Sequence, residues 1–321
     1  MAQGFMFLGV VARRPTRVAR FFTSMTAPRP AASIVLAAPG SAGEVLVGLV
    51  RRSKGSSSFA GMVVFPGGVV DQADKAGLAS MGPTTLADAG PRYTAIREVL
   101  EEVRVPLVLD KSGKRVQLDQ RDLNQWGSEV HKDAKQFSGR CTAQGWSPDL
   151  SSLFPVVRFI TPELEAQRMK KGGFDTHFFL AMLPSVPQAA ADGVEVHDLL
   201  WLTPTDALEK LKKGELSMAP PQYFILLRLV GLTMQSLAGD MTSDRWELER
   251  NIPFRPFPIM EEHGLSLALP GDEQHDQYPG VSGAQHRVKV IGAGKGSVLG
   301  GEYRYERSDS VLLHNVAKSK M

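Results

Sequence analysis

The chain of 321 residues has only one cysteine, Cys141, and no long hydrophobic run. One cysteine can form neither an internal disulfide nor a cysteine metal cluster, so the sequence fits a reducing compartment. No apolar run reaches the ~18 residues needed to cross a bilayer, so we expect no membrane span. Acidic residues are also absent from the first 43 positions, which sets that segment apart from the rest.

Positive charge is concentrated at the start of the chain. Residues 1–43 contain five arginines: Arg13, Arg14, Arg17, Arg20 and Arg29. Without them, the 37 basic residues of the chain become 32, against 34 acidic residues. The body of the protein is therefore not basic, and we expect no stable nucleic-acid partner.

Both ends of the chain have features of targeting signals. We interpret residues 1–31 as a leader or targeting segment, because an arginine-rich, acid-free start is typical of a mitochondrial presequence. A disordered basic tail is the alternative. The last residues, Ser319-Lys320-Met321, differ from the Ser-Lys-Leu peroxisomal address only at the final position. They predict a peroxisomal import receptor as a partner and the peroxisome as the location, with the mitochondrion, or a frayed terminus, as alternatives.

Short strand-like runs alternate with helical patterns, which predicts an α/β fold. Ser33–Ala38 and Val45–Arg51 flank a tip rich in Gly, Pro and Ser, so they should form a hairpin. Further strands are expected at Met62–Phe65, Val105–Leu109, Phe154–Ile160, Phe174–Leu183 and Glu195–Leu202.

Helices are expected at Thr94–Val103, Thr205–Lys213 and Pro221–Leu237, with a polar helix or linker at Gln117–Phe137. Residues 71–93 have little periodicity and are predicted to be an inserted loop. Residues 240–321 are rich in turns, with late strands near Val288–Ile291 and Tyr303–Tyr305.

Three glutamates share one face of the expected helix around Arg97-Glu98-Val99-Leu100-Glu101-Glu102-Val103. Glu98, Glu101 and Glu102 are related as i, i+3 and i+4, so their side chains lie together. Such close carboxylates repel one another unless they are neutralised, and hard divalent cations that prefer oxygen ligands do this well. The alternative is a solvated acidic face with helix-stabilising pairs such as Glu101 with Arg97.

This stretch resembles the core of the Nudix box, the motif of a superfamily of metal-dependent diphosphate hydrolases. Gly68 takes the place of the box's first glycine, and Asp74 stands where the first glutamate is usual. The resemblance implies an α/β/α sandwich with a mixed sheet, an insertion within the box and a C-terminal extension. It places the Nudix domain at residues 32–235 and the extension, which ends in the peroxisomal-type tail, at residues 236–321.

The sequence departs from the box in two places. The gap from Asp74 to Arg97 is longer than the box allows, which a surface loop can absorb because closure entropy grows slowly with loop length. Arg104 replaces the usual glycine after the helix. This puts the left-handed helix exit in doubt, since arginine tolerates that conformation less well.

By resemblance, Glu98 and Glu102 are the first metal ligands, Glu101 is the third, and Mg²⁺ or Mn²⁺ is the expected ion. Arg97 should orient a carboxylate, and Asp74 is a structural member of the motif. Family members often use a later glutamate as ligand or base, so Glu195 joins Glu101 as a catalytic candidate, although a strand-edge acid is the alternative. His131, His177 and His197 lack ligand-like spacing, and we interpret them as ordinary polar residues.

Upstream residues resemble the signature of the coenzyme A branch of the Nudix hydrolases. The matching positions, which are the expected substrate-binding residues, are Arg52, Ser53, Gly61, Phe65, Gly67 and Gly68. Ser57 stands where the signature has a second arginine. A further likeness to the long peroxisomal acyl-CoA diphosphatases lies in the runs Phe159–Pro162, Phe174–Ala181 and Trp201–Pro204.

The resemblance therefore implies a metal-dependent diphosphatase that cuts coenzyme A or acyl-CoA into 3′,5′-ADP and (acyl-)phosphopantetheine. One alternative keeps the chemistry but changes the substrate to ADP-ribose, NADH or an RNA cap. Another is a degenerate Nudix module that binds without turnover, against which the three intact glutamates argue.

Overall fold

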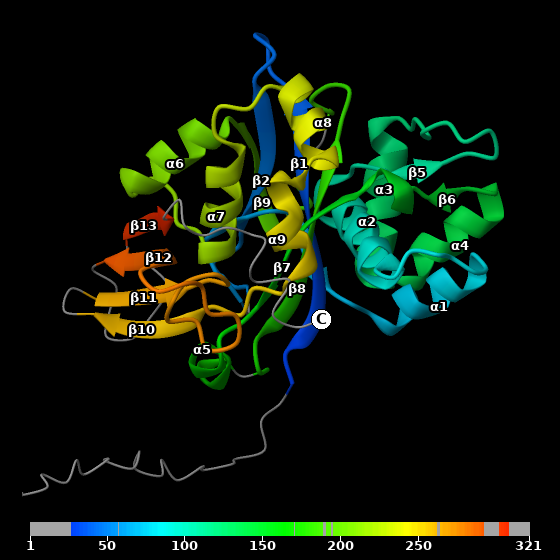
Figure 1. The fold of residues 1–321 in the computed structure, drawn as a ribbon. Coiled ribbons are helices and arrows are strands. Elements are labelled where there is room, and N and C mark those ends of the chain that lie inside the picture. The colour runs from blue at the N-terminus through cyan, green and yellow to red at the C-terminus, as the bar shows by residue number, and fades with distance from the viewer. Residues whose placement is uncertain are drawn as a thin grey trace, which may run out of the picture.

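The computed structural model describes residues 27–56, 58–169, 171–188, 191–193, 195–261, 264–291 and 302–307. Its centre is a seven-stranded sheet with the path β3-β2-β1-β8-β7 (Figure 1). β1 (Arg29–Pro39) pairs antiparallel with β2 (Val45–Arg52), which confirms the predicted hairpin. β1 also pairs parallel with β8 (Phe174–Met182), so the sheet is mixed, as predicted.

Four shorter strands complete this sheet: β3 (Val63–Val64), β4 (Gly67–Val69), β7 (Phe154–Ile160) and β9 (Val196–Leu202). β4 pairs with β1, and β9 pairs with β2 on the outer side of the hairpin. The strands predicted at Met62–Phe65, Phe154–Ile160 and Glu195–Leu202 are thereby confirmed, with small changes at their ends, whereas β4 was not predicted. The pairing of β4 with β1 brings the glycine turn against the centre of the sheet.

Alternate side chains of β1 enter two separate cores, which produces three layers. Val35 and Ala37 face a core shared with α6 (Pro204–Lys212), α7 (Pro220–Leu229), α8 (Met234–Thr242) and α9 (Glu247–Asn251). Ile34 and Leu36 face the core beneath α2 (Ala89–Val103), α3 (Gln120–Lys132) and α4 (Lys135–Gln144). A strand covered on both faces has to be apolar throughout, as this run is. The predicted α/β/α sandwich is confirmed.

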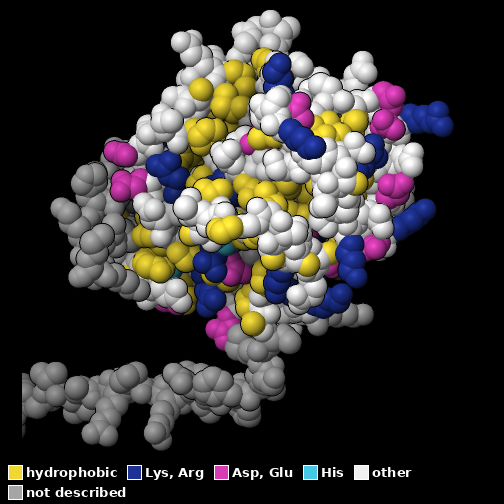
Figure 2. All heavy atoms as spheres, turned by 90° about the vertical axis from the view of Figure 1, so that its right-hand side faces the viewer, with side chains coloured by type: hydrophobic (Ala, Val, Ile, Leu, Met, Phe, Trp, Pro, Cys, Tyr) yellow, Lys and Arg dark blue, Asp and Glu magenta, His cyan; other side chains and the backbone are white. Residues whose placement is uncertain are grey.

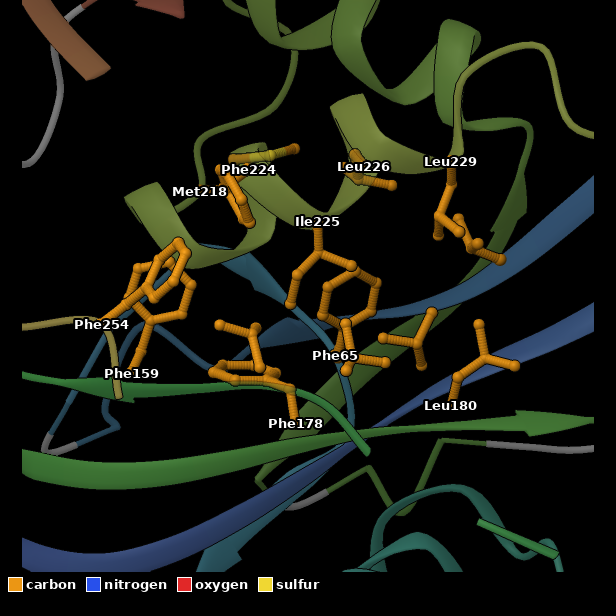
Figure 3. Close-up of a cluster of buried hydrophobic side chains, with 14 of the residues drawn as sticks. Phe65, Phe159, Phe178, Leu180, Met218, Phe224, Ile225, Leu226, Leu229 and Phe254 are labelled. Carbon is orange, nitrogen blue, oxygen red and sulfur yellow. The ribbon is translucent and has the colours of Figure 1, made fainter. Parts of the chain in front are cut away.

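The first of these cores contains a cluster of phenylalanines among its aliphatic side chains (Figure 3). Phe159 makes edge-on contacts with Phe178, Phe224 and Phe254, at centroid separations of 6.2, 5.8 and 5.4 Å. Phe65 meets Phe178 edge-on at 6.5 Å and is 2% exposed. Such edge-to-face pairs contribute about 0.5–1.5 kcal/mol beyond the area they bury. The expected substrate contact Phe65 is thus also a core residue.

The C-terminal part of the chain builds a second, antiparallel sheet. Its strands follow in order: β10 (Phe257–Glu261), β11 (Gly264–Ala268), β12 (His286–Ile291) and β13 (Glu302–Arg307). The late strands predicted near residues 288–291 and 303–305 are confirmed, whereas β10 and β11 were not predicted. Tyr303 donates a hydrogen bond from its hydroxyl to the carbonyl of Met218 at 3.0 Å, so the extension packs on the first core.

Several expectations about individual elements are wrong. Residues 71–93 are not a loop throughout, because α1 (Gln72–Ser80) lies within them and α2 already begins at Ala89. The helix expected at Pro221–Leu237 is split into α7 and α8, since Gly231 between them adopts a φ of 75°. The strand expected at Val105–Leu109 shrinks to β5 (Val108–Leu109), which pairs with β6 (Ser147–Pro148).

Short elements complete the described chain: the 3₁₀ turns η1 (Leu150–Ser152) and η2 (Asp244–Trp246), and the helix α5 (Glu163–Arg168). None of the helices described here is long and apolar enough to span a bilayer. Acidic and basic side chains are interspersed on the face shown in Figure 2. The expectations for residues 1–26, Ser57 and the tail Ser319–Met321 lie outside the described residues.

Candidate active site

The amphipathic helix α2 positions the three glutamates. Ile96, Val99, Leu100 and Val103 are fully buried against the sheet, which leaves the carboxylate face directed toward β4. The helix ends at Arg104, whose φ of 60° is left-handed. Its guanidinium donates to the carbonyls of Leu100 and Glu101 at the end of the helix. Arginine therefore makes the turn for which the box normally uses glycine, and these hydrogen bonds offset the steric cost.

Arg97 lies at the centre of the site, where it joins three carboxylates. Its Nε and Nη2 reach the two oxygens of Asp74 at 2.6 and 3.0 Å. Nη1 donates to Glu101 at 2.8 Å, and Nη2 also donates to Glu98 at 2.8 Å. The planar guanidinium suits this arrangement, because its donors form a fixed fork. The predicted orienting role of Arg97 agrees with this geometry.

Asp74 is fixed from a second direction by the helix α1. It accepts the backbone N–H of Asp71 at 2.9 Å, and Asp71 in turn caps the helix through the N–H of Ala73 at 2.7 Å. Thr94 donates its hydroxyl to Asp74 at 2.8 Å. Asp74 is only 1% exposed. The shorter aspartate thus fills the place of the box's glutamate as a buried anchor for Arg97.

Two glycines allow the backbone to approach both the sheet and the glutamates. A Cβ on Gly67 would lie 2.3 Å from the carbonyl oxygen of Ala32, and one on Gly68 would lie 2.4 Å from a carboxylate oxygen of Glu98. The N–H of Gly67 donates to Glu102 at 2.9 Å. Any larger residue would therefore displace either the strand or the carboxylates.

Arg52, at the end of β2, reaches the opposite side of the carboxylate group. Its guanidinium lies 3.4 Å from Glu102 and 3.5 Å from Glu195, and its Nε donates to the carbonyl of Ser58 at 3.2 Å. The backbone N–H of Ser53 donates to the carbonyl of Glu195 at 2.9 Å. This hydrogen bond holds the segment before β9 against the loop after β2, and Glu195 therefore lies near the glutamates of α2.

A histidine from α3 joins the same group. Nδ1 of His131 lies 2.9 Å from a carboxylate oxygen of Glu101. Ligand atoms of Glu101, His131 and Glu195 all lie within 4.8 Å of one another. His131 was expected to be an ordinary polar residue, because its proximity to Glu101 arises from the packing of α3 on α2 and leaves no local spacing signal.

Burial of so many carboxylates raises their affinity for protons. The pKa of Glu98 rises to about 7, because of desolvation first and repulsion from Glu101 as well, although Arg97 opposes the rise. The pKa of Glu102 also lies well above its usual value, through burial and then through its proximity to Glu98. The positive charges of Arg97 and Arg52 therefore do not fully compensate the negative charge here.

The group therefore fits a divalent cation. Its donors are carboxylate oxygens and one imidazole nitrogen, a set suited to Mg²⁺ or Mn²⁺. The raised pKa values of Glu98 and Glu102 show that further positive charge would stabilise the ionised forms. Glu98, Glu101 and Glu102 could hold the ion on α2, and Glu195 and His131 could complete its surroundings.

All of these side chains except Glu102 line one large cleft of about 1060 Å³. Of the predicted site residues, the structure brings eight to its walls: Arg52, Phe65, Gly67, Gly68, Arg97, Glu98, Glu101 and Glu195. Glu102 and Asp74 lie behind this wall at 2% and 1% exposure. Ser53 and Gly61 do not line the cleft; they shape the loop after β2, where Gly61 has a φ of 73°.

Comparison with known proteins gives one family match and several similar relatives. The family model described as the NUDT19 Nudix domain matches residues 77–229. Acyl-coenzyme A diphosphatase NUDT19 of Gallus gallus is 28% identical over 313 residues, covering 79% of this chain and 82% of the relative. The protein of that name from Homo sapiens is 27% identical over 302 residues, covering 76% and 80%.

A solved structure shows the same fold. The NUDIX hydrolase from Alicyclobacillus acidocaldarius superposes with a TM-score of 0.60 and 27% sequence identity. The match covers 68% of this chain and 98% of that protein. The family match includes the carboxylate helix, and the solved NUDIX hydrolase shares this fold over nearly all of its length, so the chain is similar to Nudix hydrolases of the NUDT19 subgroup.

Proposed function

We propose that the protein hydrolyses the diphosphate bond of coenzyme A or acyl-CoA in a metal-dependent reaction. The observation that carries the proposal is the under-compensated carboxylate group of α2, which opens into a cleft large enough for a nucleotide. The relatives named acyl-coenzyme A diphosphatase direct the choice of substrate. The products would be 3′,5′-ADP and (acyl-)phosphopantetheine.

The residues of the site have separate tasks in this reaction. Glu98, Glu101 and Glu102 would hold Mg²⁺ or Mn²⁺, which when bound offsets diphosphate charge and lowers the pKa of water. Arg97 keeps Glu98 and Glu101 in place through its hydrogen bonds. Gly67 and Gly68 let the backbone lie directly against β1 and Glu98, where a larger residue would displace the strand or the carboxylate.

Arg52 would contact the diphosphate. Its guanidinium lies beside Glu102 and Glu195, so a phosphate oxygen bound between the glutamates would be within its reach. Glu195, with 47% of its side chain exposed, or Glu101 would accept the proton of the attacking water. An exposed carboxylate exchanges that proton with solvent readily, which favours Glu195 over Glu101 as the proton acceptor.

A substrate panel tests the proposal. Coenzyme A, acyl-CoA, ADP-ribose, NADH and capped RNA would be incubated with the protein and Mg²⁺ or Mn²⁺, and the products separated by chromatography. We expect the highest kcat/KM for coenzyme A compounds, with 3′,5′-ADP as a product. A higher kcat/KM for ADP-ribose, NADH or capped RNA would overturn the substrate, and a lack of turnover on all of them would favour a binding module.

We also propose import into peroxisomes through Ser319-Lys320-Met321. Imaging of a tagged full-length chain and of a chain without these three residues tests it, with the tag placed away from the C-terminus. We expect peroxisomal signal only for the full-length chain. A purely mitochondrial signal would instead favour the arginine-rich start.

A further inference from the structure

The cleft continues beyond the glutamates to an aromatic and basic region at the start of β1. Arg29, Phe59 and Phe174 line it there, together with Arg168 and Lys171. The rings of Phe59 and Phe174 are 5.8 Å apart and inclined by 31°. The guanidinium of Arg29 lies 4.4 Å from the centre of the Phe174 ring. The mechanism above uses none of these side chains.

Two features of this region suggest a binding site. Phe59 adopts a φ of 54°, a left-handed conformation that is costly for a residue with a large side chain. Among the described residues, the buried Nε of Arg29 has no hydrogen-bond partner. A strained backbone at Phe59 and an unsatisfied buried donor at one wall of a cleft are typical of groups held ready for a ligand.

The spacing along β1 fits a nucleotide. Ala32 is paired with Gly68, beside Glu98, and Arg29 is paired with Phe174. Three residues of strand separate these two pairs, which corresponds to about 10 Å. A ribose with its base spans a distance of this order, so a diphosphate at the glutamates could place its base at the phenylalanines.

We infer that Arg29, Phe59 and Phe174 form the subsite for the 3′-phosphoadenosine end of the substrate, which rests on the function proposed above. The adenine stacks on the two phenylalanine rings, and Arg29 donates to the 3′-phosphate. The acyl-pantetheine arm carries neither an aromatic ring nor a phosphate beyond the diphosphate. It therefore matches this region less well than the nucleotide does.

Binding of the product fragments tests this subsite without turnover. Calorimetry would measure the Kd of 3′,5′-ADP, 5′-AMP and phosphopantetheine for the full chain and for Arg29→Met, Phe174→Leu and Phe59→Asn. Asparagine tolerates the left-handed backbone at position 59, so that variant removes the ring without adding strain. Arg121→Met and Phe257→Leu are matched controls, because both residues are exposed and lie outside the cleft.

We expect Arg29→Met to weaken 3′,5′-ADP about tenfold and 5′-AMP much less, since one charged hydrogen bond to the 3′-phosphate is lost. Phe174→Leu and Phe59→Asn should weaken both nucleotides, by roughly tenfold for a lost stacking ring. Phosphopantetheine should bind all variants as it binds the unaltered protein. Both controls should keep their nucleotide affinity.

Wild-type affinity of Phe59→Asn and Phe174→Leu for the nucleotides would overturn the subsite. Equal weakening of both nucleotides in Arg29→Met would overturn the assignment of Arg29 to the 3′-phosphate. Turnover is measured separately. If coenzyme A is not hydrolysed but the nucleotides still depend on these residues, the proposed reaction fails and the subsite stands.

Discussion

Within the described part of the chain, two buried arginine–aspartate pairs have nearly the same geometry but very different surroundings. Beside the glutamates of α2, Arg97 holds both oxygens of Asp74; in the C-terminal sheet, Arg287 holds both oxygens of Asp272, at 2.8 and 2.9 Å. Both arginine side chains are 4% exposed. The paired aspartates are equally well buried, at 1% and 0%.

The difference lies in the charges around each pair. Asp272 also accepts the backbone N–H of His286 at 2.8 Å, and the adjacent Glu261 is shared by Arg287 and Lys289. Around Arg97 the extra groups are glutamates instead, and the pKa values of two of them are raised. The same buried pair thus belongs to a balanced structural group in one place and to a cation-binding group in the other.

Removing one glutamate charge should have the largest effect on activity. We expect Glu98→Gln and Glu102→Gln to lower kcat/KM by roughly 10²–10³-fold or more, because each removes a negatively charged ligand of the proposed cation. Glu261→Gln in the C-terminal group is the matched control and should keep full activity. Near-native rates in either site variant at saturating Mg²⁺ would contradict the carboxylate assignment.

The Glu98→Gln variant should also be more stable without metal at alkaline pH. The folded pKa of Glu98, about 7, lies above the usual 4.5, so its stabilising contribution is complete below 4.5 and is lost as pH rises through 7. Glutamine stays neutral and avoids that loss. Thermal unfolding in EDTA at about pH 8 compares the stability of the two proteins. A lower Tm for Glu98→Gln than for the unaltered protein would contradict the raised pKa.

Breaking either arginine–aspartate pair should cost about 3–5 kcal/mol of stability, because an unpaired charge remains buried. We expect Arg97→Met and Arg287→Met to lose similar free energies of unfolding in denaturant titrations. Only Arg97→Met should then lose activity under conditions where both variants are still folded. Equal loss of activity in the two folded variants would remove the distinction between the groups.

The affinity of the α2 glutamates for a metal ion should depend on pH. Glu98 has to release its proton when the cation binds, so the affinity for Mn²⁺ should fall roughly tenfold for each pH unit below about 7. Calorimetric titration in buffers of different ionisation enthalpy measures both the affinity and the proton release. A flat affinity between about pH 5.5 and 8 would show that Glu98 is already ionised.

The smallest effect is expected at Arg52, beside the glutamates. Arg52→Ala should raise the KM for coenzyme A and for dephospho-coenzyme A alike, by about tenfold, because a diphosphate contact is common to both. Steady-state kinetics on the two substrates decides this. A selective effect on coenzyme A would move Arg52 to the 3′-phosphate, and a fall in kcat alone would assign it to the transition state.

Local patterns in the sequence predicted much of the fold and the centre of the site. The β1–β2 hairpin follows from two strand-like runs around a tip rich in Gly, Pro and Ser, and the shared face of Glu98, Glu101 and Glu102 follows from the helical period of 3.6 residues. The helix α1 was missed because its small residues give almost no periodicity, although Asp71 and Asp74 form a capping box. His131 could not be predicted, since only tertiary packing brings it to Glu101.

The packing of the C-terminal sheet has a consequence for the solubility of shortened chains. Leu265, Leu267, Val288 and Val290 of this sheet belong to the same core as α7 and β7. Leu267 and Pro256 also line the cleft. A chain that stops at residue 235 would leave the apolar surface of α7 open to water. Such surfaces promote self-association, so expression of residues 32–235 alone should yield aggregates rather than a smaller soluble enzyme.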